Sequence, residues 1–419
     1  MSTGEYLFYV GVDWATEAHR VVVLDAARRP VADRVVPHTG VALAALAEDL
    51  ATQAAGEVAR VAIAIEVPRG PVVETLLERG FAVFALNPKQ LDRFRDRHSV
   101  AGAKDDRRDA WVLADALATD RAAFRALRPD TPAVIRLREL GRTEDELQQE
   151  LTRLANRLRE QLLRFYPQAL ALCPAAQEPW FWALLALAPT PAAAQALART
   201  QVAALLRAHR IRRLTTDEVL AQLQVPAVHV APGTAEAASE HIAWLLLRVR
   251  LVHEQRRECA QRLEQVLEAL AEGELGQPGE QRDVTILRSL PGVGRVVTAT
   301  LLAEAAAAVT TRDYHALRAQ TGAAPITRQS GKRWAVGMRY ACNGRLRTAV
   351  YHWARVSVQR DAHSCHHYAQ LRARGHSHAR ALRGVVDRLL RILIVMLKTH
   401  TLYDPGRRRP IAQPVEQTA

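Results

Sequence analysis

Cysteine is scarce in this chain of 419 residues: it has four cysteines, far apart in the sequence, and no CxxC pair. This spacing argues against a disulfide framework and against a cysteine-rich zinc site. The cluster of His363, Cys365, His366 and His367 offers possible metal ligands, although a polar loop between two helices is the simpler interpretation. We therefore expect neither a disulfide-stabilised domain nor a zinc-ribbon protein.

Long apolar runs are also missing. A membrane-spanning helix needs about 18 or more consecutive apolar residues, and the most apolar segment, 389–398, is shorter and is flanked by arginine. The first residues carry acids and lack the basic region that begins a signal peptide. We therefore expect a cytoplasmic protein with no membrane partner.

Lysine is rare as well, since arginine supplies 53 of the 57 positive charges. The charge is unevenly distributed along the chain. Residues 281–419 hold 23 Lys and Arg against 7 Asp and Glu, whereas residues 1–280 hold 34 against 37. A basic region beside a nearly neutral one indicates a polyanionic partner, most often nucleic acid. Arginine suits this role because its guanidinium group binds phosphate through two hydrogen bonds.

Residues 1–125 have the pattern of an α/β domain. Three strands within 6–37, joined by short turns, predict an antiparallel meander. Two continuous apolar runs predict buried parallel strands, and amphipathic stretches predict helices between and after them. The predicted later strands are 61–67 and 81–87, and the predicted helices are 41–54, 71–79, 88–97 and 106–119. This order of elements is typical of a ribonuclease-H-like fold.

Residues 126–280 read as a helical region. Apolar residues alternate at spacings of three and four from Leu137 to Phe165 and again from Ile242 to Leu270. Each seam is long enough for a coiled coil, formed either within one chain or between two chains. We expect a homodimer or a higher oligomer on DNA. Between the seams, the Ala- and Pro-rich residues 171–239 predict an inserted helical subdomain.

The last folded region is predicted at 281–403. Its PGVG sequence, residues 291–294, precedes an apolar helix and suggests a helix–hairpin–helix motif. Gly292 and Gly294 permit tight turns, and backbone N–H groups at the following helix start can bind a phosphate. Residues 404–419 lack an apolar period and are expected to be a disordered tail.

Four acids form the candidate metal site. Asp13 ends the first strand, and Glu66 is the only charge in its apolar run. Asp106 and Asp109 are three residues apart and so share a helix face, while Asp105 is either a helix cap or a further ligand. Singly, each has an ordinary explanation as a turn or a cap. Clustered carboxylates repel one another unless cations separate them, and oxygen ligands favour Mg²⁺ or Mn²⁺.

Several of these segments resemble the bridge-RNA-guided DEDD transposases of bacterial insertion sequences. The N-terminal matches are YVGVDWA, IEVP, Asn87-Pro88 and KDDRRDA, and the C-terminal ones are LPGVG, TGAAPITRQSGKRW and NGRLRTAV. The resemblance covers about residues 6–120 and 284–400. It implies a RuvC-like N-terminal domain and a C-terminal transposase domain with a helix–hairpin–helix. Asp105 departs from the family pattern, in which a small polar residue is more usual, so that either Asp105 or Asp106 can be the third ligand.

The resemblance also implies a mechanism and partners. The four acids would bind Mg²⁺ or Mn²⁺, and Ser330 would attack a DNA phosphate as a serine nucleophile. Donor DNA, target DNA and a guide RNA would be the partners. Basic residues near Ser330 would hold phosphates, namely Arg328, Lys332, Arg333, Arg339, Arg345 and Arg347. Trp334 and Trp353 are candidates either for stacking on bases or for core packing.

Two other functions share part of this pattern. A structure-specific nuclease such as a Holliday-junction resolvase would use the same carboxylates with water as the nucleophile. A non-catalytic architectural protein would need neither the acids nor a divalent metal. A covalent adduct between DNA and Ser330 is expected of the transposase and of neither alternative.

Overall fold

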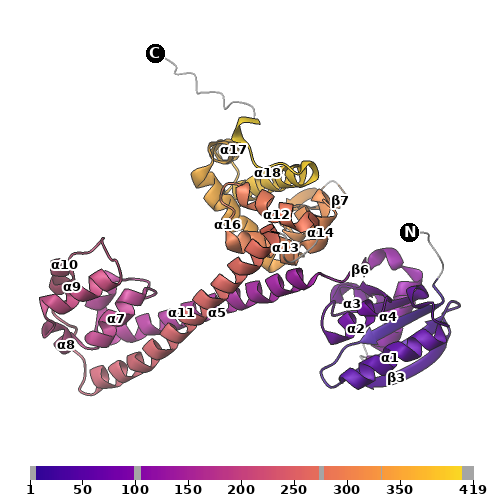
Figure 1. Ribbon diagram of the computed structural model, residues 1–419, viewed down its shortest axis with the longest axis horizontal. Coiled ribbons are helices and arrows are strands. Elements are labelled where there is room, and N and C mark those ends of the chain that lie inside the picture. Colours follow the sequence, from indigo (N-terminus) through magenta and orange to yellow (C-terminus); the bar gives the residue numbers. More distant parts are fainter. Residues whose placement is uncertain (1–5, 99–104, 273–277, 332, 408–419) are drawn as a thin grey trace, which may run out of the picture. The chain divides into compact units, whose positions relative to one another are not determined.

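The computed structural model describes residues 6–98, 105–272, 278–331 and 333–407, which divide into two compact units, Met1–Asp130 and Thr131–Ala419 (Figure 1). The division lies a few residues beyond the one expected after residue 125. The boundary expected after residue 280 falls inside the second unit. Among the described residues, no helix is both long enough and apolar enough to cross a membrane.

The first unit is built on a six-stranded mixed sheet with the order β3-β2-β1-β4-β5-β6. The meander and the parallel pairing of β4 with β1 confirm the predicted strands. β6 was not predicted, because two residues are too few to show an alternating pattern; it pairs antiparallel with β5. The strands are β1 (Phe8–Asp13), β2 (Ala18–Asp25), β3 (Pro30–Pro37), β4 (Val61–Ile65), β5 (Ala82–Ala85) and β6 (Arg125–Ala126).

Helices cover both faces of this sheet. On one face, α1 and α2 pack against the valine and isoleucine side chains of β1, β2 and β4. On the other face, α4 packs on the small residues Ala62 and Ala64 and on Val22 and Leu24 of β2. The helices of this unit are α1 (Gly40–Gln53), α2 (Pro71–Glu78), α3 (Pro88–His98) and α4 (Asp106–Thr119), with short 3₁₀ turns at Val58–Arg60 and Arg121–Ala123.

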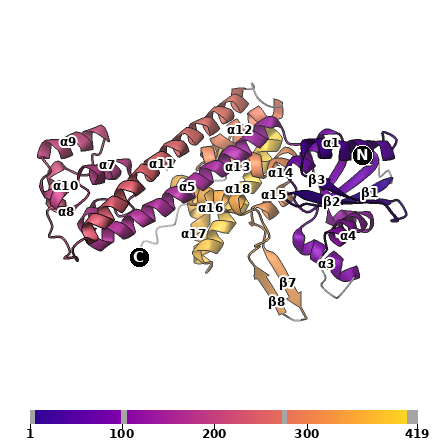
Figure 2. The ribbon, with the colours of Figure 1, turned by 90° about the horizontal axis from the view of Figure 1, so that it is seen from below.

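In the second unit, the two predicted seams lie on α5 (Pro132–Phe165) and α11 (Thr234–Glu272), which pack side by side (Figure 2). The helices are antiparallel, since Leu137 near the start of α5 shares a core with Leu263 near the end of α11. The polar positions of the two seams also meet, with Arg256 Nε 3.4 Å from Glu144 Oε1. The apolar side chains of both seams are therefore buried against each other within one chain. The seams no longer give a reason to expect a dimer.

Residues 166–233 form a small helical subdomain at the far end of this helix pair (Figure 1). Three of its helices have proline in the first turn, where the missing N–H needs no partner. Trp180, Phe181 and Trp182 are buried in its core. The helices are α6 (Pro167–Leu172), α7 (Pro179–Leu187), α8 (Pro191–Gln195), α9 (Arg199–Ala208) and α10 (Thr216–Leu223).

The C-terminal part is mainly helical and carries one β-hairpin, β7 (Ile326–Ser330) and β8 (Arg333–Gly337) (Figure 2). Its helices are α12 (Pro278–Ser289), α13 (Arg295–Glu304), α14 (Ala306–Thr310), α15 (Tyr314–Gln320), α16 (Gly344–Arg360), α17 (Ala362–Ala373) and α18 (His378–Thr399), with a 3₁₀ turn at Pro405–Arg407. The His/Cys cluster at 363–367 lies on α17, so its interpretation as a loop was wrong. Most of the expected disordered tail, 408–419, is outside the described residues.

Candidate active site

Asp13 and Glu66 stand at neighbouring positions on one edge of the sheet. β1 and β4 are parallel, and Val12 lies opposite Ile65 in their register. Asp13 is the last residue of β1, Glu66 directly follows the end of β4, and both side chains are half-buried. The carboxyl ends of parallel strands are where ligands bind in open α/β sheets, so two of the predicted acids share such an edge.

Helix α4 packs directly on β1 because Gly11 has no side chain. A Cβ at Gly11 would lie 1.8 Å from the carbonyl oxygen of Ala110 and 2.8 Å from the backbone nitrogen of Ala114. Asp115, farther along α4, pairs with Arg28 in the turn after β2, near the start of β1. Since Asp115 lies at that end, the first turn of α4 lies toward the end of β1.

An ion pair also links the start of α4 to this part of the sheet, because Arg107 Nε in its first turn lies 2.6 Å from Asp33 Oδ2 of β3. Arg20 on β2 is opposite Asp13 in the sheet register. The pKa of Arg20 is raised chiefly by its hydrogen bond with Asp33, and the charges of Asp105 and Asp106 raise it further. The predicted acids of α4 thus lie on the same side of the sheet as Asp13.

Asp109 is already paired with an arginine. Its carboxylate is buried and accepts hydrogen bonds from Arg95 Nε at 2.5 Å and Nη2 at 2.9 Å. Arg95 lies on α3 and also donates to Asp92 at 2.5 Å. Sequence reasoning missed Arg95, because α3 shows only an ordinary alternation of charged residues.

The acids fit Mg²⁺ in chemistry but are not gathered around one point. Among the described residues, no group of three or more His, Cys, Asp or Glu side chains is arranged to hold a metal ion. Asp105 is exposed and caps α4, accepting a hydrogen bond from the backbone of Arg107 at 3.4 Å. The all-oxygen donor set suits a hard divalent cation. To bind that cation, Asp109 would have to give up its ion pair with Arg95.

Ser330 lies at the end of an exposed hairpin. It is the last residue of β7 and pairs in register with Arg333 across the turn. Gly331 follows it with φ +54°, a left-handed conformation that favours glycine. A side chain at Gly331 would meet nothing within 4 Å, so the glycine serves the turn rather than packing. Ser330 itself is exposed at the end of β7.

The predicted phosphate ligands around Ser330 differ in their surroundings. Arg328 is exposed on the same strand as Ser330. Arg345 is half-buried, with its Nε 3.5 Å from Asp145 of α5, and Arg347 contacts the sulfur of Cys342 at 3.9 Å. Arg339 is also half-buried. Lys332 and the side chain of Arg333 lie outside the described residues. Of the predicted phosphate ligands that the structure describes, Arg328 is the exposed one.

The PGVG turn is fixed to α16. The carbonyl oxygen of Pro291 accepts hydrogen bonds from Ser357 Oγ at 2.7 Å and from Trp353 Nε1 at 3.0 Å. Gly292 has φ +80°, and a Cβ there would lie 2.9 Å from the backbone nitrogen of Ser357. Packing thus requires Gly292, whereas Gly294 is exposed at the start of α13 with open space beside it.

The two tryptophans of this region have different roles. Trp353 is fully buried in the core, while Trp334 on β8 is 70% exposed. Trp334 therefore remains the one of this pair that is able to stack on a base.

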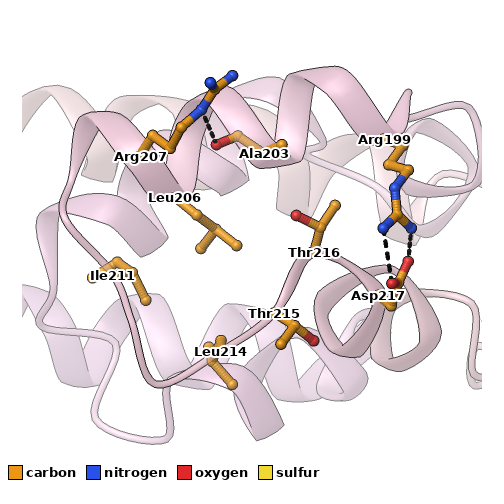
Figure 3. A pocket seen from close by; sticks show the side chains of 9 residues that line it. All are labelled: Arg199, Ala203, Leu206, Arg207, Ile211, Leu214, Thr215, Thr216 and Asp217. Carbon is orange, nitrogen blue, oxygen red and sulfur yellow. Dashed lines mark hydrogen bonds and ion pairs between the residues drawn. The ribbon is translucent and has the colours of Figure 1, made fainter.

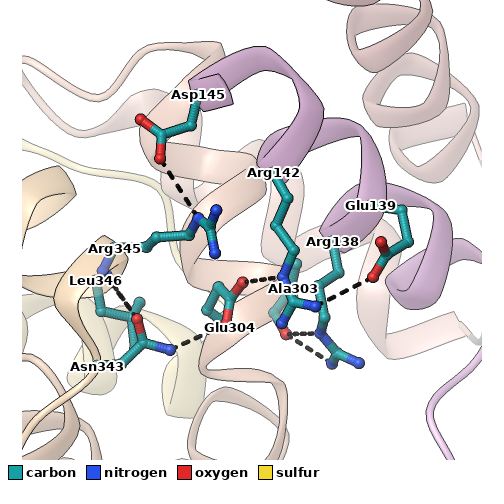
Figure 4. Close-up of polar contacts among 9 residues, drawn as sticks. All are labelled: Arg138, Glu139, Arg142, Asp145, Ala303, Glu304, Asn343, Arg345 and Leu346. Carbon is teal, nitrogen blue, oxygen red and sulfur yellow. Dashed lines mark hydrogen bonds and ion pairs between the residues drawn. The ribbon is translucent and has the colours of Figure 1, made fainter. Parts of the chain in front are cut away.

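A polar network ties the hairpin-bearing region to α5 (Figure 4). Glu304 at the end of α13 accepts from Arg142 of α5 at 3.1 Å and from the amide of Asn343 at 2.9 Å. Burial favours the neutral carboxyl, but these hydrogen bonds outweigh it and lower the pKa of Glu304. Arg138 donates to the carbonyl oxygen of Ala303 at 2.8 Å. Sequence reasoning missed this network, because its members are far apart in the chain.

Comparison with known proteins identifies the class. A family model described as "Transposase" matches residues 10–167, and one described as "Transposase IS116/IS110/IS902 family" matches residues 284–370. The first match contains Asp13, Glu66 and Asp109, and the second contains Ser330. Both regions that carry the candidate residues are thus parts of transposase families.

Individual relatives extend the match to the whole chain. "Putative transposase y4uE" of Sinorhizobium fredii is 47% identical over 54% of this chain and 62% of its own length. "Mini-circle putative transposase for IS117" of Streptomyces coelicolor is 30% identical over 95% of this chain and 96% of its own. "Insertion element IS110 uncharacterized 43.6 kDa protein" of the same organism is 28% identical over 94% and 95%. The chain belongs to the IS116/IS110/IS902 family and is a DNA transposase.

Proposed function

We propose that this transposase cleaves and rejoins DNA strands with Ser330 as the nucleophile and with Mg²⁺ or Mn²⁺ held by Asp13, Glu66, Asp106 and Asp109. The observation that supports the proposal is that Asp13 and Glu66 occupy neighbouring positions at the carboxyl ends of β1 and β4, while α4, which carries Asp106 and Asp109, packs directly on β1. The N-terminal unit would be ribonuclease-H-like, in keeping with its meander followed by parallel strands. Membership of a transposase family does not favour a hydrolytic junction resolvase.

The acids would bind the ion through oxygen alone. Mg²⁺ bound there would stabilise the attacking and leaving oxygens of a phosphodiester. Asp13 at the end of β1 and Glu66 directly after β4 are half-buried, and Asp109 is positioned by α4. Asp105, which caps the helix, is a second-choice ligand to Asp106.

The serine step conserves the phosphodiester. Ser330 Oγ would form a bond to a DNA phosphorus as one bridging P–O bond breaks. The serine proton leaves, and the released DNA oxygen takes up a proton. A DNA hydroxyl then attacks the serine phosphodiester, which rejoins the strand and restores the serine. A serine hydroxyl is a weak nucleophile, so the reaction depends on activation by a base or a metal.

The basic C-terminal region would hold the nucleic acids. Donor and target DNA and a noncoding guide RNA are the proposed partners, and the excess of 23 basic over 7 acidic residues supports binding of polyanions. The turn between α12 and α13 would act as a helix–hairpin–helix, with Gly294 and the exposed start of α13 near a phosphate. The α5–α11 pair would act as an intramolecular coiled coil, and the active form would be at least a homodimer.

Ser330→Ala tests the nucleophile. The variant should lose strand cleavage and the covalent adduct but bind DNA as the wild type does, because it loses one hydroxyl and no charge. The adduct is measured by trapping labelled DNA on denatured protein and mapping the labelled peptide. Thr327→Ala, which removes another exposed hydroxyl of β7, is the matched control and should keep the adduct.

Two outcomes would refute this assignment. An adduct on a peptide without Ser330 would move the nucleophile elsewhere. Cleavage by Ser330→Ala at the wild-type rate would favour the hydrolytic resolvase.

A further inference from the structure

The small helical subdomain carries a concentrated positive charge that the proposed chemistry does not use. The end of α9 and the segment that follows it, residues 207–213, read RAHRIRR and are here called the basic loop. Elsewhere in residues 171–239 only Arg199 is basic, while four residues are acidic. The charge is therefore local to this loop and is not a property of the whole subdomain.

Not all of these arginines are available to a ligand. Arg213 donates to Glu178 at 2.7 Å and lies over the ring of Trp180, and Arg199 is paired with Asp217. Arg207, Arg210 and Arg212 are exposed. Within the described chain no carboxylate forms an ion pair with any of these three. They are the arginines whose charge is left for a partner.

The basic loop is held in a defined shape. Arg213 anchors its end to α7 through Glu178, and this pair is supported by the hydrogen bond from Trp180 to the same carboxylate at 2.9 Å. Arg210 has φ +54°, and the backbone N–H of Ile211 returns to the carbonyl of Leu206 at 2.9 Å. A preorganised loop loses less conformational entropy on binding than a flexible one.

A cavity of about 500 Å³ opens beside this loop (Figure 3). Leu206, Ile211 and Leu214 form an apolar side, and Thr216 and the Arg199–Asp217 pair lie across from it. Its volume is within the usual range for sites of small organic groups. An apolar surface flanked by hydroxyls and guanidinium groups suits a flat, polar-edged group such as a nucleobase.

We propose that the basic loop and this cavity bind a single-stranded segment of nucleic acid, with phosphates on Arg207, Arg210 and Arg212 and an unpaired base in the cavity. A duplex does not offer such a base, because its bases are stacked and paired. A basic surface that binds successive phosphates is a general feature of single-strand binding, and bases usually stack on aromatic side chains. In this cavity the apolar side chains of Leu206, Ile211 and Leu214 would contact the base instead. This inference is independent of the chemistry proposed for Ser330.

Hydrogen exchange on the full chain tests the location. A single-stranded RNA oligonucleotide, a DNA oligonucleotide of the same sequence and its duplex are each added to saturation. We expect slower exchange in the peptides covering 199–217 with a single strand, and little change there with the duplex. Comparison of the RNA and DNA arms identifies which strand the site prefers. Wild-type exchange in 199–217 that no oligonucleotide slows would overturn the proposal, and so would equal protection by the duplex or by a free mononucleotide.

Arg210→Ala combined with Arg212→Ala tests the chemistry. Protection of 199–217 should disappear, and the slope of log Kd against log salt, from fluorescence anisotropy, should fall by about 0.7 for each phosphate that no longer binds an arginine. The matched control is Arg257→Ala with Arg262→Ala, which removes the same charge from α11, where each arginine is already paired with a glutamate. The control should keep both the slope and the protection. A loop variant with wild-type slope and protection would overturn the proposal.

Ala203→Phe tests the cavity separately, because its ring would occupy the space of a base. It should weaken binding of the single strand while leaving the salt slope unchanged. Thermal unfolding of each variant establishes that the subdomain is folded. Unchanged affinity in a folded Ala203→Phe variant would mean that no base binds in the cavity, and this would overturn that part of the proposal.

Discussion

The pairing of Asp109 with Arg95 provides a buried carboxylate with a partner of opposite charge. A buried carboxylate without a partner is costly, and removing one partner of a buried ion pair destabilises a protein by about 3–5 kcal/mol. Arg95 supplies the positive charge in this structure. A divalent cation at the proposed site would supply the same compensation. If Asp109 binds the metal as proposed, Arg95 and the metal compete as partners of the same carboxylate.

Arg95→Ala should expose this competition. Without divalent cations, the variant should be less stable than the wild type by about 3–5 kcal/mol, because Asp109 is left buried and unpaired. Added Mg²⁺ or Mn²⁺ should recover much of that loss, and should stabilise the variant more than it stabilises the wild type. Thermal unfolding in EDTA and in Mg²⁺ measures both effects.

Arg97→Ala is the control for this experiment. Arg97 lies on the same helix, and its ion pair with Asp120 is half-exposed on both sides. Exposed pairs contribute less than about 1 kcal/mol, so the control should change little with or without metal. If Mg²⁺ stabilises Arg95→Ala no more than the control, Asp109 is not a metal ligand.

Some of these residues could be predicted from the sequence, and others could not. Asp13 and Glu66 end apolar runs, so their place at strand ends follows from local pattern. Arg95 could not be predicted, because its partner depends on how α3 packs against α4. Ser330 came from a family resemblance, since a serine in a basic turn has no distinctive local pattern.

At the scale of elements, the contact between α4 and β1 positions the acids of the helix. Gly11 permits this contact, since the carbonyl oxygen of Ala110 occupies the place of a Cβ. The sequence predicted α4 and β1 but not their closeness. A glycine within an apolar strand is the signal that could have indicated it.

Gly11→Ala should push α4 away from the sheet. Overpacking of a tight core contact costs about 1–3 kcal/mol and sometimes more. Calorimetry should therefore show a lower unfolding temperature for the transition of the first unit alone. Gly40→Ala, at a position with no neighbouring atom within 4 Å, should change stability by no more than about 0.5 kcal/mol. Equal unfolding temperatures for the two variants would mean that the contact is not tight.

The helical seams show where periodicity stops being informative. Spacings of three and four predicted both long helices, whereas the pairing of Glu144 with Arg256 is seen only in the structure. They could not say whether the partner helix belongs to the same chain, because the same pattern serves both arrangements. The long insertion between the seams lets the chain turn back, and this allows the intramolecular pairing.

At the scale of the whole molecule, a different surface now supports a dimer. Trp244, Leu247 and Leu251 lie on α11 at spacings of three and four, and they are 64%, 68% and 59% exposed. They form a second apolar stripe on a helix whose other face is already buried against α5. A stripe of this kind on identical chains is complementary to its own copy across a two-fold axis. We therefore expect the partner of this stripe to be a second copy of the chain.

Leu247→Glu combined with Leu251→Glu should convert the dimer to a monomer. The change places two carboxylates in an apolar contact, where burying an unpaired charge is unfavourable, and it leaves the α5–α11 core intact because both side chains are exposed. Light scattering over a range of concentrations measures the mass. Val395→Glu, at a residue of α18 that is 55% exposed, is the control and should remain dimeric. A wild-type chain that is monomeric at every concentration, with and without DNA, would contradict the dimer, and a double variant with the wild-type mass would place the interface elsewhere.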